Sequence, residues 1–149
     1  MNKSNKFAVT LAALATVATS LFVSLHPASA AATELSVEIK GIASNSGDVY
    51  VAIYDKAEKW MKTSLSSAKV AAKKGSVSVS FKDLPEGDYA ISLYHDENGN
   101  GKMDSNVIGM PTEPYAFSND AAGNFGPASF EQAKFTVGGE KKSIIINIK

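Results

Sequence analysis

Apolar and polar residues alternate over most of the chain beyond residue 34. The alternation has a period of two in six segments: 35–39, 49–53, 77–81, 89–93, 135–137 and 144–148. Successive side chains of a β-strand point to opposite faces, so this period predicts strands with one buried face. In the segment 49–54 both faces are apolar, which predicts a strand in the middle of a sheet.

Clusters of turn-forming residues separate these segments. They are Asn45-Ser46-Gly47-Asp48, Leu84-Pro85-Glu86-Gly87 and Gly138-Gly139. Residues 57–61 lack the alternation and predict one short helical turn, with Trp60 folded onto the strands. Many short strands separated by turns predict an all-β protein, an antiparallel β-sandwich.

The segment from Asp96 to Phe130 interrupts the pattern and is rich in glycine, proline and polar residues. An irregular segment of this length is unusual inside a domain and is often functional. It also holds several large apolar residues: Ile108, Met110, Tyr115, Phe117, Phe125 and Phe130. These are too many for a solvated linker, so we expect one long ordered loop that packs on the sandwich.

The N-terminal 30 residues have the pattern of a secretory signal peptide. Lys3 and Lys6 precede an apolar run over 7–25, and small residues follow at Ala28-Ser29-Ala30. A transmembrane anchor is the alternative, since about 20 apolar residues span a bilayer. The run is rich in Ala, Thr and Ser and ends at Pro27, which favours cleavage after Ala30. We therefore predict a single domain over 31–149, periplasmic or secreted, with no membrane span in the mature form.

The amino-acid composition argues against several classes of function and of stabilising bond. The chain has no cysteine, so disulfides and an acylated-cysteine lipid anchor are excluded. Its 15 basic residues are all lysines, balanced by 15 acidic residues. Without arginine or a concentrated basic face, nucleic-acid binding has no support.

Two motifs resemble known families. The Leu84–Tyr89 turn, written L-P-E-G-D-Y, resembles that of transthyretin-like and carboxypeptidase-regulatory-like sandwiches. The segments 94–104, 109–119 and 126–131 resemble the signature of DUF2141, a bacterial exported domain of unknown function. This resemblance implies a transthyretin (prealbumin)-like, Ig-like sandwich and an exported location. It implies no activity.

A calcium loop is the sharpest chemical signal in the sequence. Oxygen-bearing side chains occupy positions one, three, five and nine of an EF-hand-type loop, glycine occupies position six, and a backbone carbonyl would serve at position seven. Position twelve is Val107 instead of glutamate, and a later glutamate would have to return to the loop. The predicted Ca²⁺ ligands are Asp96, Asn98, Asn100, Lys102 through its carbonyl, Asp104 and Glu113. The alternative is a hairpin turn without metal, because Asn-Gly and Asp-rich stretches also form such turns.

His95 and the segment 113–119 each allow two interpretations. The histidine would be either a general base acting with Ser118 or Glu113, or a strand-end residue that hydrogen-bonds the loop; the second is favoured. Residues 113–119 would either line a pocket for a peptide or glycan, or pack Tyr115 and Phe117 over an open edge of the sandwich.

The pattern as a whole predicts an exported, non-catalytic binding or structural module with a calcium-ordered loop. Its ligand would be a protein, a peptide or a glycan, and no residue is assigned to catalysis. One alternative is a hydrolase acting at a cleft formed by His95, Asp96 and Glu113. Another is a carbohydrate-binding sandwich with exposed aromatic residues on one face.

Overall fold

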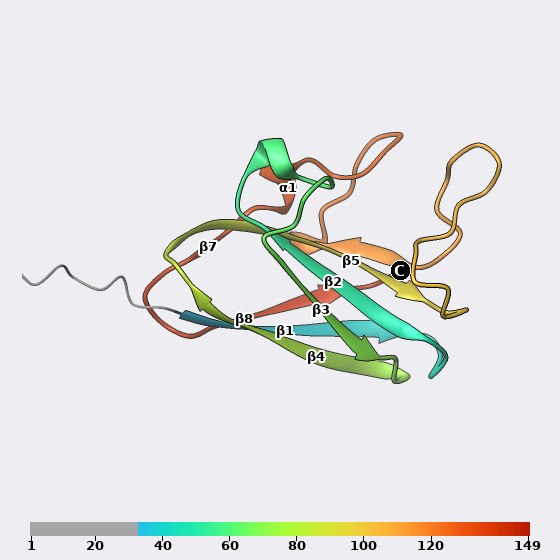
Figure 1. The fold of residues 1–149 in the computed structure, drawn as a ribbon, viewed down its shortest axis with the longest axis horizontal. Helices are drawn as coiled ribbons and strands as arrows, with labels where there is room; N and C mark the ends of the chain where they lie inside the picture. The colour runs from blue at the N-terminus through green and yellow to red at the C-terminus, as the bar shows by residue number, and fades with distance from the viewer. Residues whose placement is uncertain (1–32) are drawn as a thin grey trace, which may run out of the picture.

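The structure is a computed structural model that describes residues 33–149 (Figure 1). The predicted signal peptide and its cleavage site at Ala30 lie outside the described residues. Eight strands are present in this part of the chain: β1 (Thr33–Ile42), β2 (Asp48–Tyr54), β3 (Ser66–Ala71), β4 (Gly75–Leu84), β5 (Gly87–Asp96), β6 (Tyr115–Phe117), β7 (Phe135–Val137) and β8 (Lys142–Asn147). No helix among these residues is long and apolar enough to cross a membrane.

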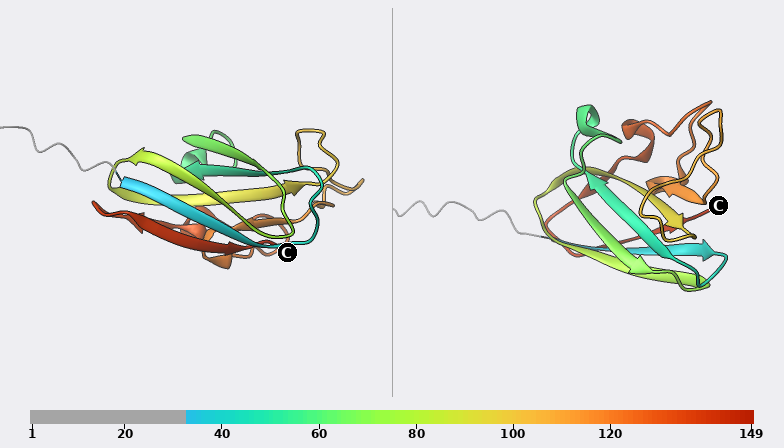
Figure 2. Two further views of the ribbon diagram at one scale, coloured as in Figure 1. Left: turned by 90° about the horizontal axis from the view of Figure 1, so that it is seen from below. Right: turned by 45° about the vertical axis from the view of Figure 1, so that its right-hand side comes forward.

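The strands form two sheets that pack face to face (Figure 2). One sheet has the order β4-β1-β8, and the other has the order β3-β2-β5-β6, with β7 pairing on the first residues of β5. The predicted all-β sandwich is confirmed, and β2 lies inside its sheet as expected. One pairing departs from the antiparallel prediction, because β1 and β8 run parallel.

Alternation builds the core between the sheets. Leu35, Val37 and Ile39 of β1 have no exposed surface and face the buried side chains of Val49 and Ile53 from β2. The alternate residues on each strand point outward. The core therefore follows directly from the period of two in the sequence.

The sequence predicts one long loop over residues 96–130, but the structure divides this segment. It contains the strand β6 and the 3₁₀ turn η2 (Ser118–Asp120), and it ends at the helical turn α1 (Phe130–Ala133). Phe117 and Phe130 are buried as predicted. Ile108, Met110, Tyr115 and Phe125 are exposed, so the expectation that all these side chains are buried on the sandwich is wrong.

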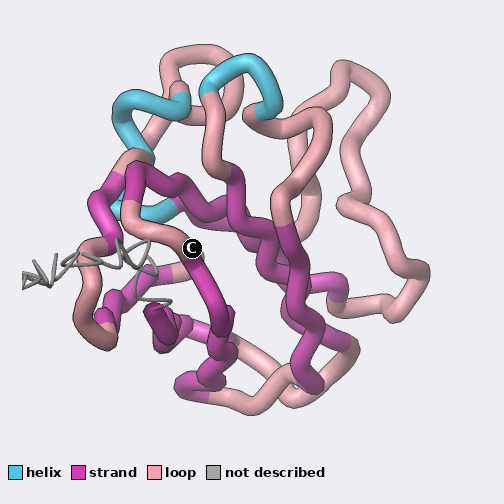
Figure 3. The backbone as a smooth tube through the Cα atoms, turned by 60° about the vertical axis from the view of Figure 1, so that its left-hand side comes forward, coloured by secondary structure: helices cyan, strands magenta, loops and turns pink. Residues whose placement is uncertain are grey.

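A second, smaller cluster of apolar residues covers one end of the outer face of the larger sheet. Trp60, which follows the 3₁₀ turn η1 (Ala57–Lys59), packs on Tyr54, Phe117 and Phe130. Its indole nitrogen donates a hydrogen bond of 2.7 Å to the Ala128 carbonyl. Trp60 thus folds onto the sandwich as predicted, and the short helical turns lie together on one side of the strands (Figure 3).

Candidate functional site

The Asp96 carboxylate organises the loop that follows β5. Its side chain is buried, and its Oδ1 accepts hydrogen bonds from the backbone N–H groups of Gly99 (2.8 Å) and Asn100 (3.1 Å). Its Oδ2 accepts from the N–H of Gly101 (2.7 Å). Three backbone donors on one carboxylate hold the chain in a tight bend, as Asp does in Asx turns.

Asn98, Asn100 and Asp104 converge beside this bend. The Nδ2 atoms of Asn98 and Asn100 donate to Asp104 Oδ2 at 2.6 Å and 2.9 Å. The amide oxygens of the same two asparagines each accept the N–H two residues further on, at 3.0 Å. The hydrogen bond from Asn100, followed by the bond from Asn98, lowers the pKa of Asp104 below its ordinary value.

Glu113 returns to the loop, as its place in the predicted ligand set requires. Its Oε1 accepts from the N–H of Glu97 (3.1 Å) and its Oε2 from the N–H of Asp104 (3.0 Å). The carboxylate is buried and joins the two ends of the loop. Lys102, the remaining predicted ligand, lies in the same bend with its side chain exposed and donates its N–H to Asn100.

The donor set of this loop suits a hard cation only if amide and carbonyl oxygens take part. Within residues 33–149, no group of three or more His, Cys, Asp and Glu side chains is placed to hold a metal ion. The Asp96 carboxylate already accepts three N–H groups, and the carboxylates of Asp104 and Glu113 accept other hydrogen bonds of the same loop. A carboxylate offers about four lone-pair sites and an amide oxygen two, so each oxygen donor keeps acceptor capacity.

His95, near the end of β5, hydrogen-bonds to the turn between β1 and β2. Its side chain has no exposed surface, and its Nε2 lies 2.7 Å from the carbonyl oxygen of Ser46, so Nε2 carries the hydrogen of this bond. Its Nδ1 is 3.8 Å from Glu97 Oε1 and has no hydrogen-bond partner in the described part of the chain. Ser118 bonds to Ile91 and Ala133 instead. These contacts support the structural interpretation of His95 over the general base.

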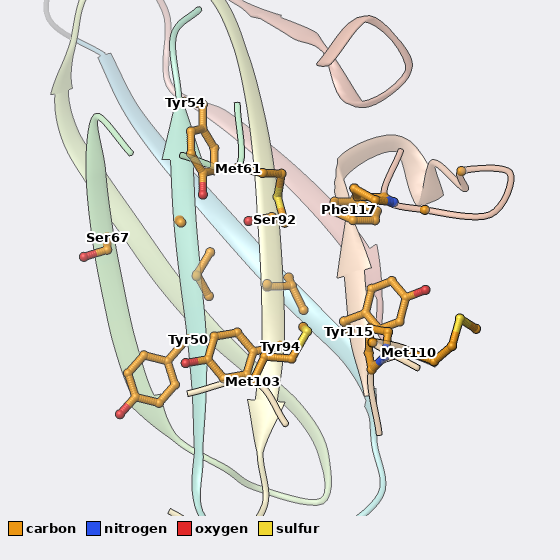
Figure 4. Close-up of a pocket in the computed structure, with 18 of the residues that line it drawn as sticks. Tyr50, Tyr54, Met61, Ser67, Ser92, Tyr94, Met103, Met110, Tyr115 and Phe117 are labelled. Atoms are coloured by element: carbon orange, nitrogen blue, oxygen red, sulfur yellow. The ribbon is translucent and has the colours of Figure 1, made fainter. Parts of the chain in front are cut away.

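An open cleft of about 720 Å³ lies over the outer face of the larger sheet (Figure 4). Its floor is made by outward-facing residues of the central strands, among them Tyr50, Ala52, Ser92 and Tyr94. Its walls come from three loop segments, which contribute Met61, Met103 with residues 108–111, and Gly123 with residues 125–127. His95, Asp96 and Glu113 do not line it, so the cleft is not the one that the hydrolase alternative requires.

Three tyrosines on neighbouring strands lie side by side on the floor of the cleft. Tyr50 of β2 pairs with Tyr94 of β5, which in turn pairs with Tyr115 of β6. The rings of Tyr50 and Tyr94 are nearly parallel, with centroids 5.1 Å apart and planes 6° from each other. The row is visible across the three strands in Figure 4. From the sequence, Tyr115 has two interpretations, as part of a pocket or as a residue packed over an edge of the sandwich. The sequence does not assign Tyr50 and Tyr94 to a pocket, although both occupy the outward positions of predicted strands.

The comparison with known families agrees with the resemblance of the loop segments. A family described as "Uncharacterized protein conserved in bacteria (DUF2141)" matches residues 37–145. The chain belongs to the DUF2141 family. The match runs from β1 to β8, so both the Asp96–Glu113 loop and the cleft lie in the family domain. No curated protein and no solved structure matches the chain, and the transthyretin-like assignment stays a prediction.

Proposed function

We propose that this DUF2141 protein is an exported, non-catalytic binding module whose Asp96–Asp104 loop binds Ca²⁺. The observation that carries the proposal is the convergence of Asn98 and Asn100 on Asp104, at 2.6 Å and 2.9 Å, with Glu113 hydrogen-bonded to the backbone of the same loop. A plain two-residue hairpin turn needs neither the third polar side chain nor a returning carboxylate. Export is supported by the signal-peptide pattern of residues 1–30.

Calcium is a hard cation that takes six to eight oxygens at about 2.3–2.6 Å. Asp104 and Glu113 would supply charged oxygens, and the Lys102 carbonyl would supply a neutral one. The two asparagines would turn their amide nitrogens away from Asp104 and direct their oxygens to the ion. Asp96 would keep the bend in place through its three N–H contacts and offer its remaining lone pair.

We expect weak binding, because Val107 at the twelfth position is fully exposed and cannot coordinate. Calcium loops of extracellular modules have dissociation constants of about 10⁻⁴–10⁻³ M. Such a site is filled only in a compartment with millimolar calcium, which agrees with export. At ten times its dissociation constant, calcium would add about 1.4 kcal/mol to the free energy of unfolding.

The test is the melting temperature of the chain 31–149, measured in chelator and in excess Ca²⁺. We expect calcium to raise it by a few degrees. Asp104→Asn should abolish this rise, because it removes a charged ligand while keeping the size of the side chain. Glu97→Gln is the matched control: it makes the same chemical change within the loop but outside the predicted ligand set, and it should keep the rise. Equal melting temperatures in chelator and calcium would show that the loop is only a turn.

Carbohydrate binding is the second candidate function, and the row of Tyr50, Tyr94 and Tyr115 is the observation that favours it. Sugars stack on aromatic faces, but their hydroxyl groups also need several hydrogen-bond partners. The polar side chains of the cleft are limited to two serines and the tyrosines. This lining fits a glycan less well than a less polar ligand.

A further inference from the structure

We propose that the cleft over the larger sheet binds one uncharged, planar, mainly apolar small molecule, stacked on the tyrosine row. The proposal names the ligand class of the binding module proposed above and does not depend on calcium binding. The volume of about 720 Å³ lies within the range of about 300–1,000 Å³ that is usual for small-molecule sites.

The floor of the cleft suits a flat ring system. Tyr50 and Tyr94 present nearly parallel rings, and Tyr115 continues the row on the next strand. Aromatic rings prefer offset stacking on such a surface over contact with water. Burial in this environment also raises the pKa of Tyr94, with a smaller contribution from Tyr50.

The rim of the cleft collects the exposed apolar side chains of the molecule. Among the described residues, eight large hydrophobic side chains are exposed, and five of them line this cleft: Met61, Ile108, Met110, Tyr115 and Phe125. Apolar groups left in water at one place mark a binding site rather than ordinary surface. Because most of the exposed apolar side chains gather at the cleft, we expect a ligand there rather than on the opposite sheet.

Two of these rim residues sit on strained backbone. Met61 has a φ of 56° and Phe125 a φ of 57°, a conformation that residues with a side chain rarely adopt. In both cases the backbone holds a bulky apolar side chain at the cleft instead of packing it away. Strain of this kind is concentrated at ligand sites, where the surrounding structure maintains it.

The chemistry of the lining excludes a charged ligand. The described residues that line the cleft include no Asp, Glu, His, Lys or Arg, and the polar side chains are those of Ser67, Ser92 and the tyrosines. A buried charge without a partner is strongly unfavourable. The methionines at 61, 103 and 110 add flexible walls, since unbranched thioether side chains adapt to different ligand shapes.

The test uses N-phenyl-1-naphthylamine, an uncharged probe with a planar naphthyl ring system, whose fluorescence rises in apolar surroundings. It is titrated into the chain 31–149, both in chelator and in excess Ca²⁺. We expect saturable binding of one probe per chain. Ile108→Glu and Met61→Glu should each weaken it by about tenfold or more, because either one brings a charge to the apolar cleft.

Matched controls separate the cleft from general surface hydrophobicity. Val107→Glu changes the neighbouring, fully exposed residue of the same loop, and Leu65→Glu changes a side chain as exposed as Met61, at 44% for both. Neither residue lines the cleft, so neither variant should alter the affinity. Equal losses in all four variants, or no saturable binding, would overturn the proposal.

The measurements in chelator and in excess Ca²⁺ distinguish the proposal for the cleft from the proposal for the calcium loop. Saturable probe binding in chelator, with no calcium effect on melting, would refute the calcium loop and leave the cleft intact. A calcium-dependent rise in melting temperature without probe binding would refute the proposal for the cleft and support the calcium loop. Binding of a neutral oligosaccharide that is lost in Ile108→Glu, with no binding of the probe, would replace the apolar ligand by a glycan.

Discussion

Ser118 completes the hydrogen bonding of β5 where two short strands leave a gap. Strand β7 pairs with residues 87–89 of β5 and β6 pairs with residues 92–94, so Ile91 lies between them. The buried hydroxyl of Ser118 accepts the N–H of Ile91 at 2.9 Å and donates to the Ala133 carbonyl at 2.5 Å. One side chain thus links β5, η2 and α1.

Replacing Ser118 by alanine should lower the free energy of unfolding by about 1–3 kcal/mol, because a buried backbone donor loses its partner. Urea unfolding of the chain 31–149 measures this. Ser78→Ala, at an exposed position of β4, is the control and should change the free energy by less than about 0.5 kcal/mol. If both substitutions cost the same, the hydroxyl does not bridge the gap.

At the scale of elements, the turn between β1 and β2 is packed against the start of the Asp96 loop. Gly47 has a φ of 70°, and a Cβ at this position would lie 1.8 Å from the carbonyl oxygen of Asp96. His95 binds the same turn through Ser46. The close approach of two backbones therefore requires glycine, and it positions the first residue of the loop.

Gly47→Ala should destabilise the protein by at least about 1–3 kcal/mol, since the clash is with backbone and cannot be relieved by a rotamer change. It should also reduce any calcium-dependent rise in melting temperature, because β5 must move where the loop begins. Gly138→Ala is the control: its Cβ would meet nothing within 4 Å and its φ is not left-handed. Thermal melts of both variants in chelator and calcium provide the comparison, and unchanged stability of Gly47→Ala would contradict the packing argument.

At the scale of the whole molecule, the sandwich holds both candidate sites on its larger sheet. The outer face of the larger sheet carries the cleft, and the loop that follows β5 lies at one end of the same sheet (Figure 1). The segment 103–111 joins the two features, because it continues the loop and because Met103 and residues 108–111 form a wall of the cleft. A ligand of either site would therefore act on the same segment.

Export is a prediction for the whole chain. Cleavage after Ala30 would remove Lys3 and Lys6, leaving 13 lysines against 15 acidic residues. We expect the intact mass of the protein recovered from a bacterial periplasm or medium to correspond to a chain beginning at Ala31. A protein that keeps Met1 and remains in the cytoplasm would contradict this prediction, and it would also lack the millimolar calcium that the proposed calcium site requires.

The sequence by itself determined the class of fold and which polar side chains meet in the loop that follows β5. The strands with regular alternation, such as β1 and β4, were predicted because burial of one face imposes a period of two on the residues. The cluster of Asp96, Asn98, Asn100 and Asp104 was predicted because these residues are close in sequence and their spacing decides their geometry.

Only the tertiary structure decided the features that depend on distant neighbours. Strand β3 was missed because it is an edge strand with few large apolar residues, none of them fully buried, and so it carries little burial signal. The exposure of Ile108 and Phe125 could not be predicted, because it depends on which surfaces other segments have already covered. The cleft itself joins side chains from Tyr50 to Pro127. Their proximity comes from strand register and loop packing, and no local pattern of residues records it.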